Sequence, residues 1–272
     1  MTERRQIAAV GVLVLLLIVS SAAVPRIVAG RPANQVNVAH LPGSRDSLAR
    51  PTGQAWENVE PSVVPLTSAP SGLPNAQDTV TDSVRVAAAT TGSRLYVRMH
   101  WRDGTKNASP ASLRDFTDAA AIEVPLQPGT QPAIAMGSVQ TPVNVWYWNA
   151  AEGPGELVAG GAGSTTRMQT TIETEAVRRN GGWTVVFHRS LHSSLENHRS
   201  FSLDRDVRVA FAVWNGANQE RAGRKAASAW MTFPFGPAET GPTYQYLLWA
   251  IAGIALAVAV LLSIVAVRRR ES

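Results

Sequence analysis

The side chains that most often carry out chemistry are few and scattered in this sequence. Cysteine is absent, which excludes iron–sulfur clusters, thiolate zinc sites, disulfides and covalent haem of the C-x-x-C-H type. There is no H-E-x-x-H pair, G-x-S-x-G elbow, Walker loop or G-x-G-x-x-G fingerprint. Only His188, His192 and His198 lie near one another, and histidines so placed are more often structural than metal ligands. Autonomous catalysis is therefore not expected.

Two other segments are distinctive in their residue types. Met136 stands beside Gly137, just before a predicted strand at 143–148. Further on, segment 209–230 runs from an apolar strand through a polar turn to Lys225, one of only two lysines among 25 basic residues. Taken alone, Met136 is typical of a core-filling residue and Lys225 of a solvated charge.

Period-two alternation of apolar residues predicts the strands that would position these segments. The alternating sets are Val84, Val86 and Ala88; Leu95, Val97 and Met99; Ile122, Val124 and Leu126; Val143, Val145 and Tyr147; Trp183, Val185 and Phe187; and Val207, Val209, Phe211 and Val213. Turn-forming residues such as Asn180-Gly181-Gly182 separate them, without helical periodicity between. We therefore predict an all-β fold, an antiparallel β-sandwich over residues 77–243.

Two further features of residues 31–243 fit this sandwich. Residues 31–76 are rich in Pro, Ser, Gly and Asn, and we expect an extended lead-in that packs over the larger domain. Six of the eight tryptophans fall on or beside predicted strands: Trp101, Trp146, Trp148, Trp183, Trp214 and Trp230. Most should fill the core, although a sandwich this aromatic can also enclose a flat apolar ligand.

Apolar runs stand at both ends of the chain. Residues 1–30 begin with a basic segment and continue as an apolar run closed by small residues, typical of a signal peptide or an uncleaved N-terminal anchor. Residues 244–267 carry no charge, begin with aromatic residues and precede Arg268–Arg270. This pattern predicts a C-terminal transmembrane helix at 244–267, a cytoplasmic tail at 268–272 and a main domain on the extracytoplasmic side of the cell membrane.

The net charge of +5 belongs mainly to these two ends. Residues 31–243 contain 19 basic and 18 acidic side chains, so the predicted domain is almost neutral. A nucleic-acid partner would need a basic surface, and none is expected here.

The chain resembles the haem b, or gamma, subunits of type II dimethyl-sulfoxide-reductase-family molybdoenzymes, such as ethylbenzene dehydrogenase, dimethylsulfide dehydrogenase and chlorate, selenate or nitrate reductases. The resemblance covers about residues 77–235. It rests on the order and spacing of several motifs: Trp101-x-Asp103-x-Thr105, Phe116-x-Asp118, Ala121-Ile122-Glu123-Val124-Pro125, Met136-Gly137, Pro142-Val143-Asn144-Val145-Trp146-Tyr147-Trp148, Gly182-Trp183-Thr184-Val185-Val186-Phe187-x-Arg189, and Phe211 to Trp230.

The resemblance implies an immunoglobulin-like or DOMON-like sandwich that holds one non-covalent haem b, with Met136 and Lys225 as the axial iron ligands. The chemistry of the two residue types is consistent with this role. A thioether raises the haem potential, and a lysine amine can bind iron once it has lost its proton, which an arginine guanidinium does not do. The C-terminal membrane helix departs from the soluble members and points toward membrane-attached relatives associated with nitrate reduction or nitrite oxidation.

The implied function is electron transfer by a non-catalytic subunit of an oxidoreductase complex. Its expected partners are an iron–sulfur subunit, a molybdopterin catalytic subunit, a membrane quinone or cytochrome, and the lipid bilayer. The alternative from another functional class is a membrane-anchored carbohydrate- or ligand-binding module without a redox cofactor. The fold alone does not distinguish this function from electron transfer. A scaffold with no cofactor is a third possibility. The two non-redox alternatives require neither Met136 nor Lys225.

Overall fold

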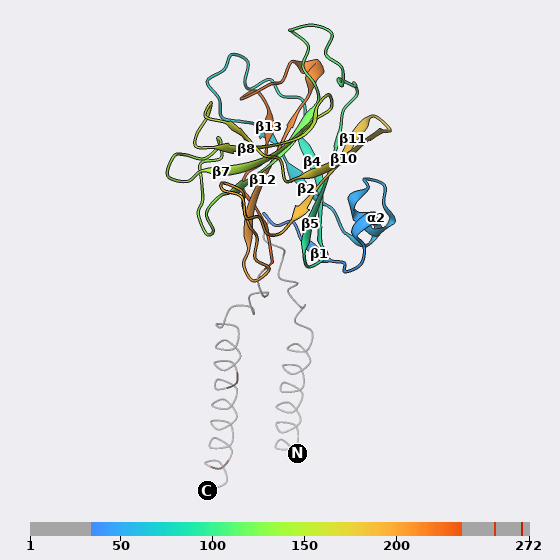
Figure 1. Cartoon of the computed structure of the whole chain (residues 1–272), viewed down its shortest axis with the longest axis vertical. Helices are drawn as coiled ribbons and strands as arrows, with labels where there is room; N and C mark the ends of the chain where they lie inside the picture. The colour runs from blue at the N-terminus through green and yellow to red at the C-terminus, as the bar shows by residue number, and fades with distance from the viewer. Residues whose placement is uncertain (1–33, 236–252, 254–267, 269–272) are drawn as a thin grey trace.

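Two β-sheets packed face to face make up the described part of the chain (Figure 1). The computed structural model describes residues 34–235 and the isolated positions Gly253 and Arg268. One sheet has the order β1 (Val38–His40), β4 (Ser83–Thr90), β5 (Arg94–Arg102), β11 (Gly182–Ser190) and β10 (Glu173–Arg179), and β2 (Ser62–Pro65) also pairs with β4. We call it the six-stranded sheet.

The second, eight-stranded sheet completes the sandwich. Its order is β3 (Thr67–Ser68), β13 (Ala226–Ala227), β12 (Val207–Trp214), β6 (Ala119–Pro125), β7 (Val143–Asn149), β8 (Gly153–Ala159) and β9 (Thr166–Met168), and β14 (Met231–Phe233) also pairs with β12. The strand pairs of both sheets are antiparallel except for the short parallel pair of β1 with β4. The helical elements in residues 34–235 are short: α2 (Arg45–Ala49), η1 (Gln54–Asn58) and η2 (Gly216–Asn218).

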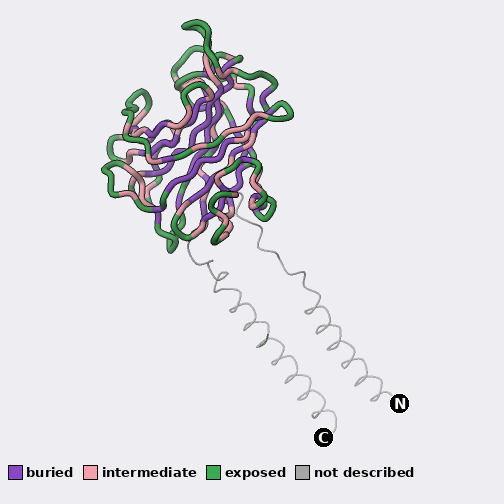
Figure 2. The backbone as a smooth tube through the Cα atoms, turned by 45° about the vertical axis from the view of Figure 1, so that its right-hand side comes forward, coloured by how far each residue is buried: buried purple, intermediate pink, exposed green. Residues whose placement is uncertain are grey.

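The core lies between the sheets because alternate strand residues point to the same side. Val86 and Val97 of the six-stranded sheet share one buried cluster with Ile122, Trp146 and Phe211 of the eight-stranded sheet. Figure 2 shows that buried residues follow the strands, whereas exposed residues gather in the loops. The alternation that predicted the strands is therefore produced by burial on the inner faces of the two sheets.

The outer faces are covered as well. On the six-stranded sheet, α2 and η1 supply Leu48 and Trp56, which pack on Ala87, Ala89 and neighbouring outward residues. On the eight-stranded sheet, all seven residues of β6 are buried, since loops close over its outward side. This second cover encloses the candidate site.

The predicted all-β sandwich is confirmed, and six of its strands, β4, β5, β6, β7, β11 and β12, lie where alternation placed them. The described part of the expected lead-in, residues 34–76, contributes β1, β2 and β3 to the two sheets. Over residues 34–235, no helix has the length and apolar character needed to cross a bilayer. Apart from Gly253 and Arg268, the predicted N-terminal segment 1–30 and C-terminal segment 244–272 lie outside the described residues.

Candidate functional site

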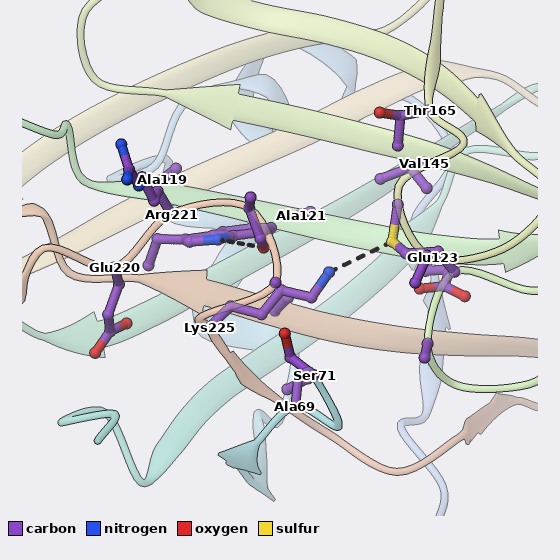
Figure 3. Close-up of a pocket in the computed structure, with 18 of the residues that line it drawn as sticks. Ala69, Ser71, Ala119, Ala121, Glu123, Val145, Thr165, Glu220, Arg221 and Lys225 are labelled. Carbon is purple, nitrogen blue, oxygen red and sulfur yellow. Dashed lines mark hydrogen bonds between the residues drawn. The ribbon is translucent and has the colours of Figure 1, made fainter. Parts of the chain in front are cut away.

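A cavity of about 400 Å³ opens on the outer side of the eight-stranded sheet. Strands β6, β7 and β12 provide its floor, and loops from distant parts of the chain provide its walls (Figure 3). Five alanines of β6, β12 and the adjoining β13 line this side of the cavity: Ala119, Ala121, Ala210, Ala212 and Ala227. They alternate with residues that face the core between the sheets, such as Ile122 of β6 and Phe211 of β12. They leave room for a flat group against the sheet.

Met136 lines this cavity from the loop between β6 and β7. Its φ of +69° lies in the left-handed region, which residues with a Cβ adopt rarely and which is enriched at functional sites. Gly137 has the same φ, and a Cβ there would lie 2.6 Å from the carbonyl oxygen of Thr141. The Gly161 N–H donates to the Met136 carbonyl at 2.9 Å. The loop thus fixes the backbone of Met136 in an uncommon conformation.

Lys225 enters the cavity from the segment that immediately precedes β13. Only 8% of the residue is exposed, and its carbonyl accepts a hydrogen bond from the Ala69 N–H at 2.9 Å. The turn before it is held by the buried Glu220, whose carboxylate accepts from the Asn215 and Val80 N–H groups, both at 3.0 Å. These bonds tie the turn to two neighbouring segments and fix the position from which Lys225 extends.

Met136 and Lys225 are 89 residues apart in sequence, and their side chains meet in the cavity. The Lys225 Nζ donates a hydrogen bond to the Met136 Sδ at 3.4 Å, drawn as the dashed line from Lys225 to a sulfur atom in Figure 3. The same Nζ lies 5.2 Å from the centre of the Trp214 ring, which is a cation–π distance. The structure therefore brings together the two residues that the resemblance singled out.

Glu123 contributes a carboxyl group to the same cavity from β6 (Figure 3). It is 8% exposed, and its Oε1 is buried without a hydrogen-bond partner among the described residues. Burial raises the pKa of Glu123 to about 8, and the positive charge of Lys225 offsets part of the rise. Burial also lowers the pKa of Lys225, against the opposing effect of Glu123. Desolvation thus favours the uncharged form of both groups.

The wall beside β6 depends on the fully buried Asp118. Its carboxylate accepts from the Asn107 N–H at 2.8 Å, the Gly216 N–H at 3.0 Å and the Trp183 Nε1–H at 2.9 Å. The bonds join the loop before β6 to β11 and to the turn after β12. They hold the rim of the cavity to both sheets.

The three histidines considered in the sequence do not line this cavity, whereas one residue that does, Glu123, was not predicted. His188 stacks on Tyr96, and His198 contacts the carbonyls of Glu196 and Gln169. Within residues 34–235 there is no cluster of three His, Asp or Glu groups arranged to hold a metal ion. Glu123 was not among the predicted site residues, although a carboxylate inside an otherwise apolar strand is a signal of a buried polar function.

The arrangement offers a specific set of donors. A thioether and a deprotonated amine are uncharged donors with lone pairs, and such ligands can coordinate a transition metal. Alanines line one side of the cavity, and the aromatic residues Trp214 and Phe116 line it as well. The geometry is that of a mostly apolar cavity, open on one side, into which a thioether and an amine extend.

The chain is similar to several known proteins. The sequence profile of the family described as "Ethylbenzene dehydrogenase" matches residues 53–171 and 154–226. A protein of Haloferax mediterranei, named as the ORF7 heme subunit of a respiratory nitrate reductase, is 45% identical over 98% of this chain and 97% of its own length. The chlorate reductase subunit gamma of Ideonella dechloratans is 32% identical over 66% of this chain and 76% of its own.

One more sequence relative and one solved structure are similar to the chain. The dimethylsulfide dehydrogenase subunit gamma of Rhodovulum sulfidophilum is 34% identical over 64% of this chain and 69% of its own. Among solved structures, a family 9 carbohydrate binding module of Caldicellulosiruptor kristjanssonii covers 76% of this chain and 100% of its own, at 13% identity and a TM-score of 0.42, too weak a likeness to carry an argument. On the sequence relatives, the chain belongs to the ethylbenzene dehydrogenase family, the gamma haem subunits of the type II dimethyl-sulfoxide-reductase family.

Proposed function

We propose that this chain is a haem b electron-transfer subunit in which Met136 and Lys225 are the two axial ligands of one non-covalently bound haem. The observation that carries the proposal is the 3.4 Å approach of the Lys225 Nζ to the Met136 Sδ inside the cavity. Relatives named as heme or gamma subunits support the assignment of cofactor class.

The residues present fit this cofactor. Haem is flat and largely apolar, and the cavity has a floor of alanines and a volume of about 400 Å³, within the usual range for small-molecule sites. Met136 and Lys225 reach the cavity from two separate loops and would be the residues that hold the haem iron. The buried, unpartnered Oε1 of Glu123 also marks the cavity as a place built for more than apolar packing.

When bound, haem supplies a one-electron redox centre whose potential depends on its axial ligands. The protein's part is to prepare those ligands. Burial lowers the pKa of Lys225, so its amine gives up a proton more readily than a solvated lysine. The loop that fixes Met136 and the turn that fixes Lys225 keep both donors in place, and Trp214 and Phe116 line the same cavity.

We further propose that the subunit works in an exported molybdenum oxidoreductase of the nitrate-reductase type. It would relay electrons between the membrane quinone pool, or a cytochrome, and an iron–sulfur subunit joined to the molybdopterin catalytic subunit. Segment 244–267 would tether the domain to the outer side of the cell membrane, with or without a second N-terminal span. This segment contains no histidine, so it offers no haem ligand of the kind usual in membrane helices.

The test is the absorption spectrum of the full chain, produced with haem available and purified in detergent. We expect a Soret band and an alpha band that sharpens on reduction with dithionite. Met136→Ala and Lys225→Ala should each abolish the low-spin spectrum, whereas two matched controls, Met168→Ala and the exposed Lys106→Ala, should leave it unchanged. A colourless wild-type chain would overturn the proposal and favour a binding module without a redox cofactor.

A further inference from the structure

A second cavity, of about 230 Å³, lies on the outer face of the six-stranded sheet. Its sheet residues are Arg85 and Ala87 of β4, Arg98 and His100 of β5, and Thr184 of β11, and Pro51 and Pro61 close it from the covering segment. These sheet residues alternate with the inward core residues of their strands. The cavity therefore lies on the opposite side of the sandwich from the one that contains Met136 and Lys225.

The polar groups of this cavity are held in fixed positions by their neighbours. The Arg98 guanidinium lies 4.9 Å from the centre of the Trp56 ring, and its Nη1 donates to the Pro51 carbonyl at 3.4 Å. The His100 Nδ1 and the Thr184 Oγ1 form a hydrogen bond of 3.0 Å. Arg98 makes one side-chain hydrogen bond within residues 34–235, so most of its donors remain for a ligand.

The two arginines of the cavity, Arg85 and Arg98, lie close enough to affect one another's charge. None of the ion pairs formed between residues 34–235 includes Arg85, Arg98 or Arg102. Burial lowers the pKa of Arg98, and the neighbouring charge of Arg85 lowers it further. Burial also lowers the pKa of His100; the Trp183 backbone opposes this, and Arg85, Arg98 and Arg102 add to it. Bringing a negative charge into the cavity would relieve this repulsion.

We propose that this cavity binds a small oxyanion, with the guanidinium groups of Arg85 and Arg98 as its main ligands. Arginine presents paired N–H groups that match two oxygens of a phosphate, nitrate or carboxylate group. His100 and Thr184 can add polar contacts from β5 and the adjacent β11. The volume is below the roughly 300 Å³ that drug-sized ligands need, so the ligand is a small ion or a terminal acid group.

The experiment is isothermal titration of the full chain in detergent with inorganic phosphate, nitrate and acetate, and with chloride as the reference ion. Saturable binding of at least one oxyanion, and its absence with chloride, is expected. Phosphate alone would indicate a tetrahedral dianion site, and nitrate or acetate alone a site for planar groups. Heats no different from those of chloride for all three oxyanions would overturn the proposal.

Variants separate the cavity from the general charge of the protein. Arg98→Gln and Arg85→Gln should each weaken oxyanion binding at least tenfold, whereas Arg208→Gln, which removes an exposed arginine from β12 of the other sheet, should leave it unchanged. Arg85 is exposed, so its replacement provides a test that does not disturb the Trp56 contact of Arg98. Equal losses in all three variants would overturn the proposal. The haem spectrum serves as an independent measure that the chain is folded.

Discussion

At the scale of the residue, the proposed function depends on a property that distinguishes lysine from arginine. The Lys225 amine is 8% exposed, and burial lowers its pKa. An arginine in the same place would keep the positive charge and the contact with Trp214, but its guanidinium stays protonated and lacks a lone pair for iron. The substitution Lys225→Arg therefore tests iron binding by residue 225 separately from its charge and its packing.

Lys225→Arg should abolish the low-spin haem spectrum while the apo chain keeps its thermal unfolding midpoint within a few degrees. The reduced-minus-oxidised difference spectrum and thermal unfolding followed by circular dichroism measure the two effects. Lys106→Arg is the matched control, since Lys106 is exposed. A Lys225→Arg chain that keeps the wild-type spectrum would show that Lys225 does not bind the iron.

Glu123 predicts a pH dependence of stability. The ordinary pKa of a glutamate is 4.5, and the pKa of Glu123 in the folded chain is about 8. Between pH 4.5 and 8, the folded state therefore binds more protons than the unfolded state. A carboxyl whose folded pKa is raised stabilises the fold at low pH, and this contribution is lost as the pH rises from about 4.5 to 8. Lys225 has the opposite effect because its pKa is lowered in the folded chain. Its contribution makes the fold more stable as the pH rises toward 10.5, the ordinary pKa of a lysine.

Glu123→Gln removes the titrating carboxyl and should flatten the dependence. As the pH rises from 5 to 8, we expect the variant to gain several degrees of thermal stability relative to the wild-type apo chain. Each unit of pKa difference is worth about 1.4 kcal/mol, and each kcal/mol moves the unfolding midpoint by about 2–4 °C. Thermal scans of the full chain at pH 5, 6, 7 and 8 measure this. Parallel curves for the two proteins would contradict it.

At the scale of the element, the loop that carries Met136 depends on Gly137. Gly137→Ala would place a methyl group 2.6 Å from the Thr141 carbonyl oxygen, at a φ of +69° that also disfavours a Cβ. We expect a loss of more than about 2 kcal/mol of stability together with a weaker low-spin haem signal.

Gly129→Ala supplies the matched control in the same loop. Gly129 has a φ of +73°, but a Cβ there would meet nothing within 4 Å. It should cost only about 1 kcal/mol, and it should leave the spectrum unchanged. Urea unfolding and the haem spectrum measure the two effects, and equal costs for the two glycines would show that the close approach at Gly137 is not important.

Asp118 links three elements around the cavity, and its replacement tests that link. Asp118→Asn leaves one carbonyl oxygen where two carboxylate oxygens accept from Asn107, Gly216 and Trp183. At least one buried donor loses its partner, at a cost of about 1–3 kcal/mol. Urea unfolding should show this loss for Asp118→Asn and almost none for the exposed Asp46→Asn. A stability equal to that of the wild type would mean that the rim does not depend on Asp118.

The same elements show what the sequence could and could not predict. Strand β11 was predictable because Trp183, Val185 and Phe187 all face the core. Its neighbour β10 was not, because this edge strand is mostly polar, and only Ala176 packs on the core. Short β1, β2 and β3 depend on pairing with strands elsewhere in the chain, which local alternation does not reveal.

The candidate site, too, was predictable from the sequence only in part. No spacing rule joins Met136 to Lys225 across 89 residues, so only the family resemblance indicated them together. Their approach depends on β12 pairing with both β13 and β6, a non-local feature of the sheet. Glu123 was missed because its effect arises from burial on the outer side of β6, a side that alternation alone would place in solvent.

At the scale of the whole molecule, the sandwich has two outer faces with different chemistry. The eight-stranded sheet presents a mostly apolar cavity with an amine, a thioether and a carboxyl group. The six-stranded sheet presents a smaller cavity with two arginines. Because the core separates them, a ligand on one face need not compete with a ligand on the other. Substitutions in one cavity should therefore leave binding in the other unchanged.

The distribution of charge over the chain makes a prediction about topology. Residues 31–243 are nearly neutral, whereas arginines precede the first apolar run and follow the second, and basic residues remain on the cytoplasmic side of a membrane. In spheroplasts expressing the full chain, a protease added outside should cleave an epitope inserted after Leu113, which is 99% exposed in a loop, and should spare an epitope attached after Ser272. Immunoblots before and after detergent lysis measure both. Protection of the Leu113 epitope, or loss of the C-terminal one before lysis, would contradict an extracytoplasmic domain tethered by segment 244–267.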